Sequence, residues 1–324
     1  PLSDAQAAAY QAQGHEVSIH VNPTCLDYTA SSLQGHYSAQ LPEWRGKYAS
    51  VPAPATVRHH CLVWSDWSSG AEVALANGVR LETNFYYWPP GWVDNAPGNF
   101  TGSAMPMRFS SLSGNLIDVY QAATQMTDES GQTYPFTIDT LLDRALGTEG
   151  YYGAYTINAH TDLPIIPEAT AVIASVKARG VPMVTSRQML NWLDGRNASS
   201  FGAFAWNGTT LSFAITTGAN VNGIQAMLPF RSGSRVLAGI TRGGTGVAFS
   251  VQSIKGIEYA FFSGIGGNYA ANYGTDAAAP TVTVTSPVAA ATGVPVNAVV
   301  TATFSEAMNA STINANTFEL RTAA

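Results

Sequence analysis

Three histidines, an arginine and a glutamate stand in segments with strand-like sequences, and their side chains could together carry out hydrolysis. They are His20, Arg58, His60, Glu82 and His160. Imidazoles bind divalent ions, and a carboxylate can take a proton from a metal-bound water. An arginine can steady negative charge, and a second imidazole can protonate the leaving group. These residue types predict a metal-water hydrolase, with His20 and His60 as metal ligands and His160, Arg58 and Glu82 as catalytic groups.

Side-chain alternation places more polar groups on the same faces. Because the period of a strand is two, Ile19 and Val21 share one face of their segment, while His20 and Asn22 share the other. The same rule puts His60 beside Arg58. With the polar faces turned inward, the expected substrate-contacting residues are Asn22, Asn84, Tyr86, Trp88 and Asn158.

Strands and helices must alternate along the first 200 residues to position these side chains. Strands are expected at 16–22, 56–64, 80–88, 116–121, 154–160 and 181–185. Helices are expected at 3–13, 68–77, 137–145, 167–179 and 186–195. A long loop rich in Ser, Tyr, Gln and Pro joins the first two strands. No glycine-rich phosphate loop follows a strand, so this order predicts a distorted or incomplete β/α barrel over residues 1–197.

One run resembles a known family motif. Gly14-His15-Glu16-Val17-Ser18-Ile19-His20 is similar to the second motif of the polysaccharide deacetylases, which act on chitin, peptidoglycan and acetylxylan and use two metal-binding histidines there. Arg58 falls where the third motif has arginine, and residues 82–88 lie near the fourth. Ile157-Asn158-Ala159-His160 resembles the fifth, whose histidine is the general acid. The resemblance implies a divalent ion, zinc being the one expected, and a polysaccharide or cell-wall glycan substrate.

The sequence departs from the family pattern at three places. The second metal histidine of the motif would fall four residues after His20, where this chain has Thr24. His60 could take that ligand position. The Thr-Phe-Asp-Asp-Gly motif, which supplies the catalytic base and a metal aspartate, would come before Ser3. If the barrel begins at Pro1, we expect the base and one ligand to be absent.

Composition limits the other possibilities. The chain of 324 residues has 11% charged residues and a net charge of −6, which gives no reason to expect a nucleic-acid partner. No apolar run reaches the roughly 18 residues of a membrane span. The low charge and the many small and aromatic residues favour a secreted or cell-surface protein. Cys25 and Cys61 could form a disulfide near the site, and two buried thiols would be equally consistent with the sequence.

The sequence pattern changes after Asn197, where the expected helices end. Residues 201–274 contain short β-like runs separated by glycine-rich turns, which predicts an antiparallel β-sandwich. A linker of small residues follows, and residues 280–324 are again β-like. Within them, the run from Val294 to Met308 resembles the start of the bacterial Ig-like domains of surface and secreted enzymes. The expected fold is therefore α/β plus all-β, a β/α barrel followed by a sandwich and a partial Ig-like domain.

Two functions from different classes fit these observations. The first is a secreted, metal-dependent hydrolase that removes acetyl groups from an N- or O-acetylated polysaccharide. The second is a catalytically inactive deacetylase-like barrel that binds glycan at the cell surface, which the missing aspartates and Thr24 would favour. A third possibility keeps the hydrolase but changes the bond to a small amide or a simple ester.

Overall fold

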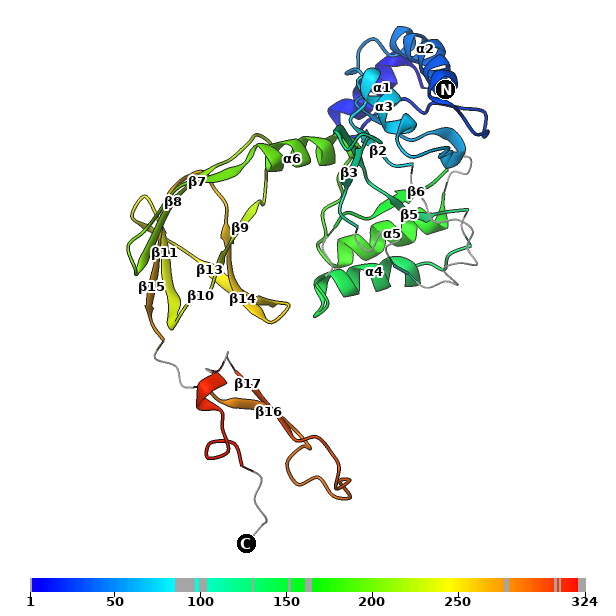
Figure 1. The fold of residues 1–324 in the computed structure, drawn as a ribbon. Coiled ribbons are helices and arrows are strands. Elements are labelled where there is room, and N and C mark those ends of the chain that lie inside the picture. The colour runs from blue at the N-terminus through cyan, green and yellow to red at the C-terminus, as the bar shows by residue number, and fades with distance from the viewer. Residues whose placement is uncertain are drawn as a thin grey trace. The chain divides into compact units, whose positions relative to one another are not determined.

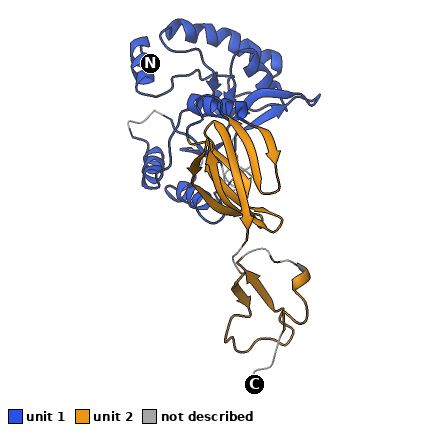
Figure 2. Cartoon of the chain, turned by 90° about the vertical axis from the view of Figure 1, so that its left-hand side faces the viewer, with its two compact units in different colours: residues 1–200, 217–222 blue, residues 201–216, 223–324 orange. Residues whose placement is uncertain are grey.

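The computed structural model describes residues 2–84, 97–98, 104–129, 131–150, 153–160, 165–276, 280–305, 308 and 310–319. The chain divides into two compact units (Figure 2), which are described separately. Unit 1 comprises Pro1–Ser200 with Thr217–Asn222, and unit 2 comprises Phe201–Thr216 with Gly223–Ala324. Among the described residues, no helix combines the length and the apolar character that a membrane crossing requires.

The helices of unit 1 follow local capping signals. Ser3 accepts from the backbone N–H of Gln6 and the Gln6 side chain accepts from the backbone N–H of Ser3, so the helix expected at 3–13 begins with a capping box. Thr185 caps the helix expected at 186–195. The helices are α1 (Asp4–Ala12), α2 (Ala30–Lys47), α3 (Ser69–Ala76), α4 (Phe136–Leu146), α5 (Pro167–Ala178) and α6 (Ser186–Ala198), with a 3₁₀ turn η1 (His60–Leu62).

Helix α2 replaces most of the loop expected after residue 22. Its 18 residues include Gly35, Pro42 and Gly46, which disfavour a helix, and its sequence lacks a clear apolar stripe. The helix begins at a capping box made by Thr29 and Ser32. The helix packs against the rest of unit 1 through three buried side chains, Leu33, Tyr37 and Leu41. Tertiary packing therefore overrides weak local propensity.

The described strands of unit 1 form two separate sheets (Figure 1). In the first, β1 (Thr56–Val57), β2 (Leu81–Glu82) and β4 (Leu116–Gln121) are parallel, and β3 (Met107–Ser110) pairs antiparallel with β4. In the second, β5 (Thr124–Thr127) pairs parallel with β6 (Thr156–Asn158). The parallel α/β organisation is as predicted. The strands in the described ranges do not join into one closed ring, and the barrel stays a prediction.

Several predicted strands are shorter or absent. The segment 16–22 is extended but pairs with no strand ladder, and 181–185 is not a strand. The strand expected over 56–64 ends at Val57, since the chain turns into η1 with Cys61 and Leu62 at φ 59° and 53°. Alternation therefore fails beyond this turn. Within the described part of the strand expected over 80–88, Leu81–Glu82 is a strand, and residues 85–88 lie outside the described ranges.

The main core of unit 1 lies where α2 and α3 cover the first sheet (Figure 1). It contains Ile19 and Val21 from the extended segment, so the predicted apolar face of that segment is confirmed. A second core joins α4 and α5 to β5 through Met126, Ile138 and Val172. Both cores fix the ends of the strands, where the polar residues gather.

Unit 2 contains the predicted antiparallel sandwich. The strands of one sheet are β10 (Arg231–Ser232), β11 (Arg235–Arg242), β15 (Gly267–Thr275), β8 (Thr210–Thr216) and β7 (Ser200–Trp206), with β12 (Thr245–Val247) on β11. The strands of the other are β13 (Phe249–Ile254), β14 (Ile257–Ser263) and β9 (Gln225–Pro229). Their inner faces share one core that includes Phe213, Tyr269 and Phe262. Further along, β16 (Val282–Ser286) pairs with β17 (Thr301–Phe304), and η3 (Ala310–Thr312) follows.

Candidate functional site

The extended segment that carries His20 runs beside the turn that carries His60. The Ser18 hydroxyl donates to the Thr56 carbonyl oxygen at 2.6 Å, and the His60 backbone N–H donates to the Val21 carbonyl oxygen at 2.8 Å. Because Val21 points into the core, His20 points to the opposite, exposed side. Two stretches 40 residues apart in sequence thus bring their imidazoles together.

The two imidazoles face each other in a defined geometry. His20 Nδ1–H donates to the Arg58 carbonyl oxygen at 2.7 Å, and because a carbonyl only accepts, this bond leaves the lone pair on Nε2. That Nε2 lies 3.3 Å from His60 Nδ1. Two nitrogens bound to one tetrahedral zinc at roughly 2.0–2.1 Å are also about 3.3 Å apart. The pair therefore fits two positions of a zinc coordination sphere.

The rest of such a sphere is not supplied by the residues that the structure describes. Within them, the one group of three possible donors is Cys25, His60 and Cys61, and its sulfur atoms are joined in a disulfide. A catalytic zinc usually has three protein ligands. His20 and His60 thus account for two ligands of a possible ion.

A second histidine site lies at the ends of β5 and β6. His160 Nδ1–H donates to Asp128 Oδ1 at 2.9 Å, and the His160 backbone N–H donates to Asp128 Oδ2 at 2.6 Å. Glu129 Oε2 is 3.8 Å from His160 Nε2. Burial raises the pKa of Asp128, but the hydrogen bonds from His160 outweigh it, so the pKa is lowered and the carboxylate stays charged. This arrangement orients the imidazole.

Asp128 is a site residue that the sequence prediction missed. The strand Thr124–Thr127 was not expected, so the residue after it was not considered. The available signal was the short run Thr124-Gln125-Met126-Thr127, which ends in Asp-Glu before a turn. Parallel pairing with Thr156–Asn158 then places Asp128 beside the segment that carries His160.

The two histidine sites lie within electrostatic reach of each other. Although the His20 side chain is exposed, partial desolvation of its ring lowers its pKa, and the positive charges of Arg58, His60 and His160 lower it further, against the hydrogen bond to the Arg58 carbonyl. Burial also lowers the pKa of Arg58, which the negative charges of Asp128 and Glu129 oppose. Arg58 Nη1 is buried and makes no hydrogen bond with the described residues. The charge of the guanidinium therefore acts on His20 and is itself acted on by Asp128 and Glu129.

The predicted catalytic carboxylate has a different environment. Glu82 is 0% exposed, and its Oε2 accepts from Asn84 Nδ2 at 3.1 Å. Burial raises the pKa of Glu82 to about 7, against that hydrogen bond. Side-chain alternation places Glu82 and Asn84 on one face, and the hydrogen bond between them agrees with this. This face, however, is part of the core, whereas His20 is exposed to solvent.

His59 connects this buried pair to the site. Its backbone N–H donates to Asn84 Oδ1 at 2.6 Å, and Asn84 Nδ2 lies 3.3 Å from His59 Nδ1. Its Nε2 is 3.0 Å from the Tyr37 hydroxyl. Burial lowers the pKa of His59 to about 4, so the ring is neutral. Because His59 lies between Arg58 and His60 in the chain, this network fixes the backbone that carries both.

The remaining predicted residues have varied positions. Asn22 is exposed, and its Oδ1 accepts from the Thr24 backbone N–H at 2.8 Å, which shapes a turn. Asn158 is half-buried at the end of β6, and its carbonyl oxygen accepts from the Asp128 backbone N–H at 3.2 Å. Tyr86 and Trp88 lie outside the described residues.

Comparison with solved structures gives weak likenesses. A bacterial fucosidase with a monovalent iminocyclitol inhibitor is 13% identical, with 83% of this chain and 70% of that chain covered and a TM-score of 0.33. An alpha-L-fucosidase GH29 from Bacteroides thetaiotaomicron is 9% identical over 84% and 70%, with a TM-score of 0.32. These are glycosidases rather than deacetylases, and such low TM-scores support no argument about fold or activity.

Comparison by sequence gives one firm result. No curated protein matches the chain significantly. Residues 276–324 match the family model of the bacterial Ig-like domain. The resemblance seen from Val294 to Met308 is therefore confirmed, because it lies within the part of the chain that matches this model.

Proposed function

We propose that unit 1 is a metal-dependent hydrolase that removes acetyl groups from an N- or O-acetylated polysaccharide. The observation that carries the proposal is the pair of imidazole nitrogens of His20 and His60, 3.3 Å apart, with the His20 tautomer fixed by a backbone carbonyl. A His–His hydrogen bond is the other explanation of this contact, although 3.3 Å is longer than the roughly 2.7–3.2 Å usual for such bonds. The substrate class comes from the resemblance of Gly14–His20 to the deacetylase motif.

The residues have separate roles in this proposal. His20 and His60 would hold a divalent ion, with zinc the first candidate, and such an ion lowers the pKa of a bound water and polarises an acyl oxygen. His160 protonates the departing amine or alcohol oxygen, and Asp128 keeps its Nδ1–H oriented. Arg58 offers positive charge to the oxyanion of the acyl group.

Glu82 is assigned to the support of the site. Its carboxyl group is enclosed and bonded to Asn84, which in turn holds the His59 backbone. Hydrolysis also needs a general base in contact with water, and a carboxyl group with 0% exposure is poorly placed for it. Asn22, Asn158, Tyr86 and Trp88 remain proposed substrate contacts.

An extracellular location accords with two observations. The Cys25–Cys61 disulfide is of a kind that persists in oxidising compartments. The bacterial Ig-like domain at residues 276–324 suits a surface or secreted protein as a spacer. We therefore propose that the hydrolase acts outside the cell, on cell-wall or environmental glycan.

The test is acetate release by the zinc-treated chain from chitin oligosaccharides and acetylxylan. The His20→Ala and His160→Ala variants should each lose at least about 100-fold in rate, since a general acid alone contributes that much. His15→Ala is the matched control, because His15 is an exposed imidazole on the same segment. Equal rates in all four proteins would contradict the proposal. Glycan binding without metal or acetate release would support the inactive, glycan-binding alternative.

A further inference from the structure

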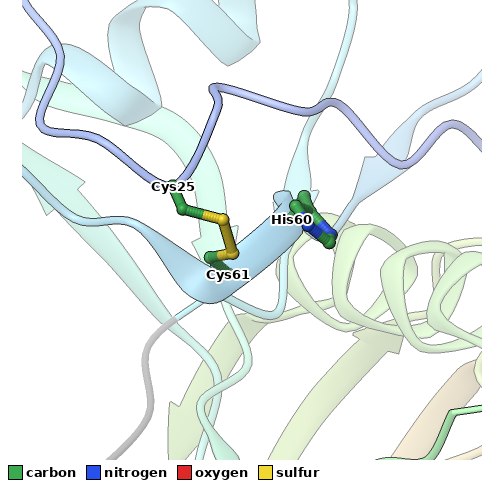
Figure 3. A group of neighbouring side chains, drawn as sticks. All are labelled: Cys25, His60 and Cys61. Carbon is green, nitrogen blue, oxygen red and sulfur yellow. A yellow bond between two sulfur atoms is a disulfide. The ribbon is translucent and has the colours of Figure 1, made fainter.

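The Cys25–Cys61 disulfide lies directly beside His60 (Figure 3). The two Cα atoms are 5.3 Å apart, and both cysteines are exposed. One donor atom from each of Cys25, Cys61 and His60 lies within 4.8 Å of the other two. A reductant can reach the disulfide from solvent, and opening it would leave two thiols next to an imidazole.

This set of donors is one that zinc and related soft ions prefer. Two cysteine sulfurs at about 2.3 Å from a tetrahedral zinc are roughly 3.8 Å apart, and a sulfur and an imidazole nitrogen are roughly 3.5 Å apart. Both separations fall within the 4.8 Å limit that the three donors already satisfy. Thiolates favour such ions over magnesium or calcium.

Backbone bonds hold the two cysteine turns in place independently of the disulfide. Cys25 and Cys61 have φ values of 57° and 59°, in the left-handed region that few side chains adopt. The Thr24 backbone N–H donates to Asn22 Oδ1 at 2.8 Å on one side. On the other side, the His60 backbone N–H donates to the Val21 carbonyl oxygen. Breaking the sulfur bond therefore leaves the donors close together.

We propose that Cys25, Cys61 and His60 form a redox-controlled metal site, closed by the disulfide and able to bind zinc once the disulfide is reduced. The existence of this site does not depend on the proposed hydrolase. The effect of this site on activity does rest on the proposed hydrolase, because His60 also faces His20. An ion held by the cysteines and His60 would withdraw one ligand from the pair formed by His20 and His60. Reduction would then switch the hydrolase off.

The chemistry balances with a dithiol as reductant. The dithiol gives two electrons, the Cys25–Cys61 bond breaks, and the dithiol becomes a disulfide while two cysteine thiols form. Binding of the ion then forms two metal–sulfur bonds and releases one proton from each thiol.

Cobalt(II) added to the whole chain tests the site, because thiolate ligands give it a charge-transfer absorption in the near ultraviolet. The chain is first reduced with a phosphine, which becomes a phosphine oxide with oxygen from water. The reduced chain should bind one ion per chain with that absorption, and the oxidised chain should lack it. His60→Ala should weaken binding by about tenfold or more, since even an outer-sphere partner is worth that much. His15→Ala should bind as the wild type does.

The outcomes separate this site from the hydrolase. His20→Ala should keep the absorption, because His20 does not belong to the three donors. If the reduced chain shows the cobalt–thiolate absorption but the oxidised chain releases no acetate, the redox site is supported and only the hydrolase is rejected. Binding that is unchanged in His60→Ala would overturn the site, as would a reduced chain that binds no cobalt or loses its fold by circular dichroism.

Discussion

Replacing Glu82 by glutamine should change how the stability of unit 1 depends on pH. The Glu82 carboxyl group is 0% exposed, and its burial raises the pKa to about 7 from 4.5. A group whose pKa is raised in the folded state is bound more tightly to its proton there. For this acid the folded state therefore loses stability as the pH rises from about 4.5 to about 7. Glutamine cannot ionise, so the variant should not suffer this loss.

The size of the effect follows from the shift. A change from 4.5 to about 7 corresponds, at 1.36 kcal/mol per pKa unit, to about 3 kcal/mol of unfolding free energy. The difference in stability between Glu82→Gln and the wild type should therefore increase by about 3 kcal/mol between pH 4 and pH 8. Below pH 4 this difference should be constant.

His59 works in the opposite direction. Burial, together with the charges of His20 and His36, lowers the pKa of His59 to about 4 from 6.5. Its neutral state is thus favoured by folding, and stability is lost as the pH falls from about 6.5 to about 4. In the wild type the opposite pH dependences of the two groups nearly cancel between about pH 4.5 and pH 6.5. In that range the unfolded chain carries one proton on His59, and the folded chain carries one on Glu82 instead. The Glu82→Gln variant should therefore become clearly sensitive to acid.

The assay is urea unfolding from pH 4 to pH 8, followed by hydrogen-exchange mass spectrometry. Peptides from residues 56–84 report on unit 1 alone, which avoids the assumption that both units unfold together. Glu43→Gln is the matched control, because Glu43 is exposed on α2. A stability difference between Glu82→Gln and the wild type that stays the same at pH 4.5 and pH 8 would refute the reasoning.

Three more changes have defined outcomes. Asn84→Ala should destabilise unit 1 by about 2–4 kcal/mol in the same urea assay, because it leaves buried hydrogen-bonding groups unsatisfied; a loss below 1 kcal/mol would contradict this. The Cys25→Ala/Cys61→Ala variant should lose about 4 kcal/mol by thermal unfolding, from loop closure over a separation of 36 residues, and an unchanged melting temperature would contradict it. Asp128→Asn should lower kcat for acetate release by about 100-fold or more with little change in KM, because His160 loses its charged partner, and a normal kcat would contradict it.

Burial was predictable from the sequence wherever one segment had one clear period. Ile19 and Val21 are in the core and His20 lies on the opposite face, as alternation required, although that face is exposed and does not turn inward as expected. The helices with good caps, such as the one after Ser3, begin within a residue of the prediction. Their signals are local, so no knowledge of distant contacts was needed.

The failures have long-range causes. Helix α2 contains Pro42 and two glycines and is stabilised by packing of Leu33 and Tyr37, which no local pattern reveals. The strand from Thr56 ends early because the backbone turns left-handed at Cys61, where it meets Cys25 from another segment. His59 and Asp128 were missed for the same reason, since their partners lie 25 and 32 residues away in the chain.

The most direct test of the central claim is the position of a metal ion in crystals of the oxidised chain soaked with zinc. Anomalous scattering should show one ion about 2.1 Å from both His20 Nε2 and His60 Nδ1. The disulfide beside them should stay intact. Zinc bound elsewhere, with these two nitrogens still 3.3 Å apart and without a metal between them, would contradict the account.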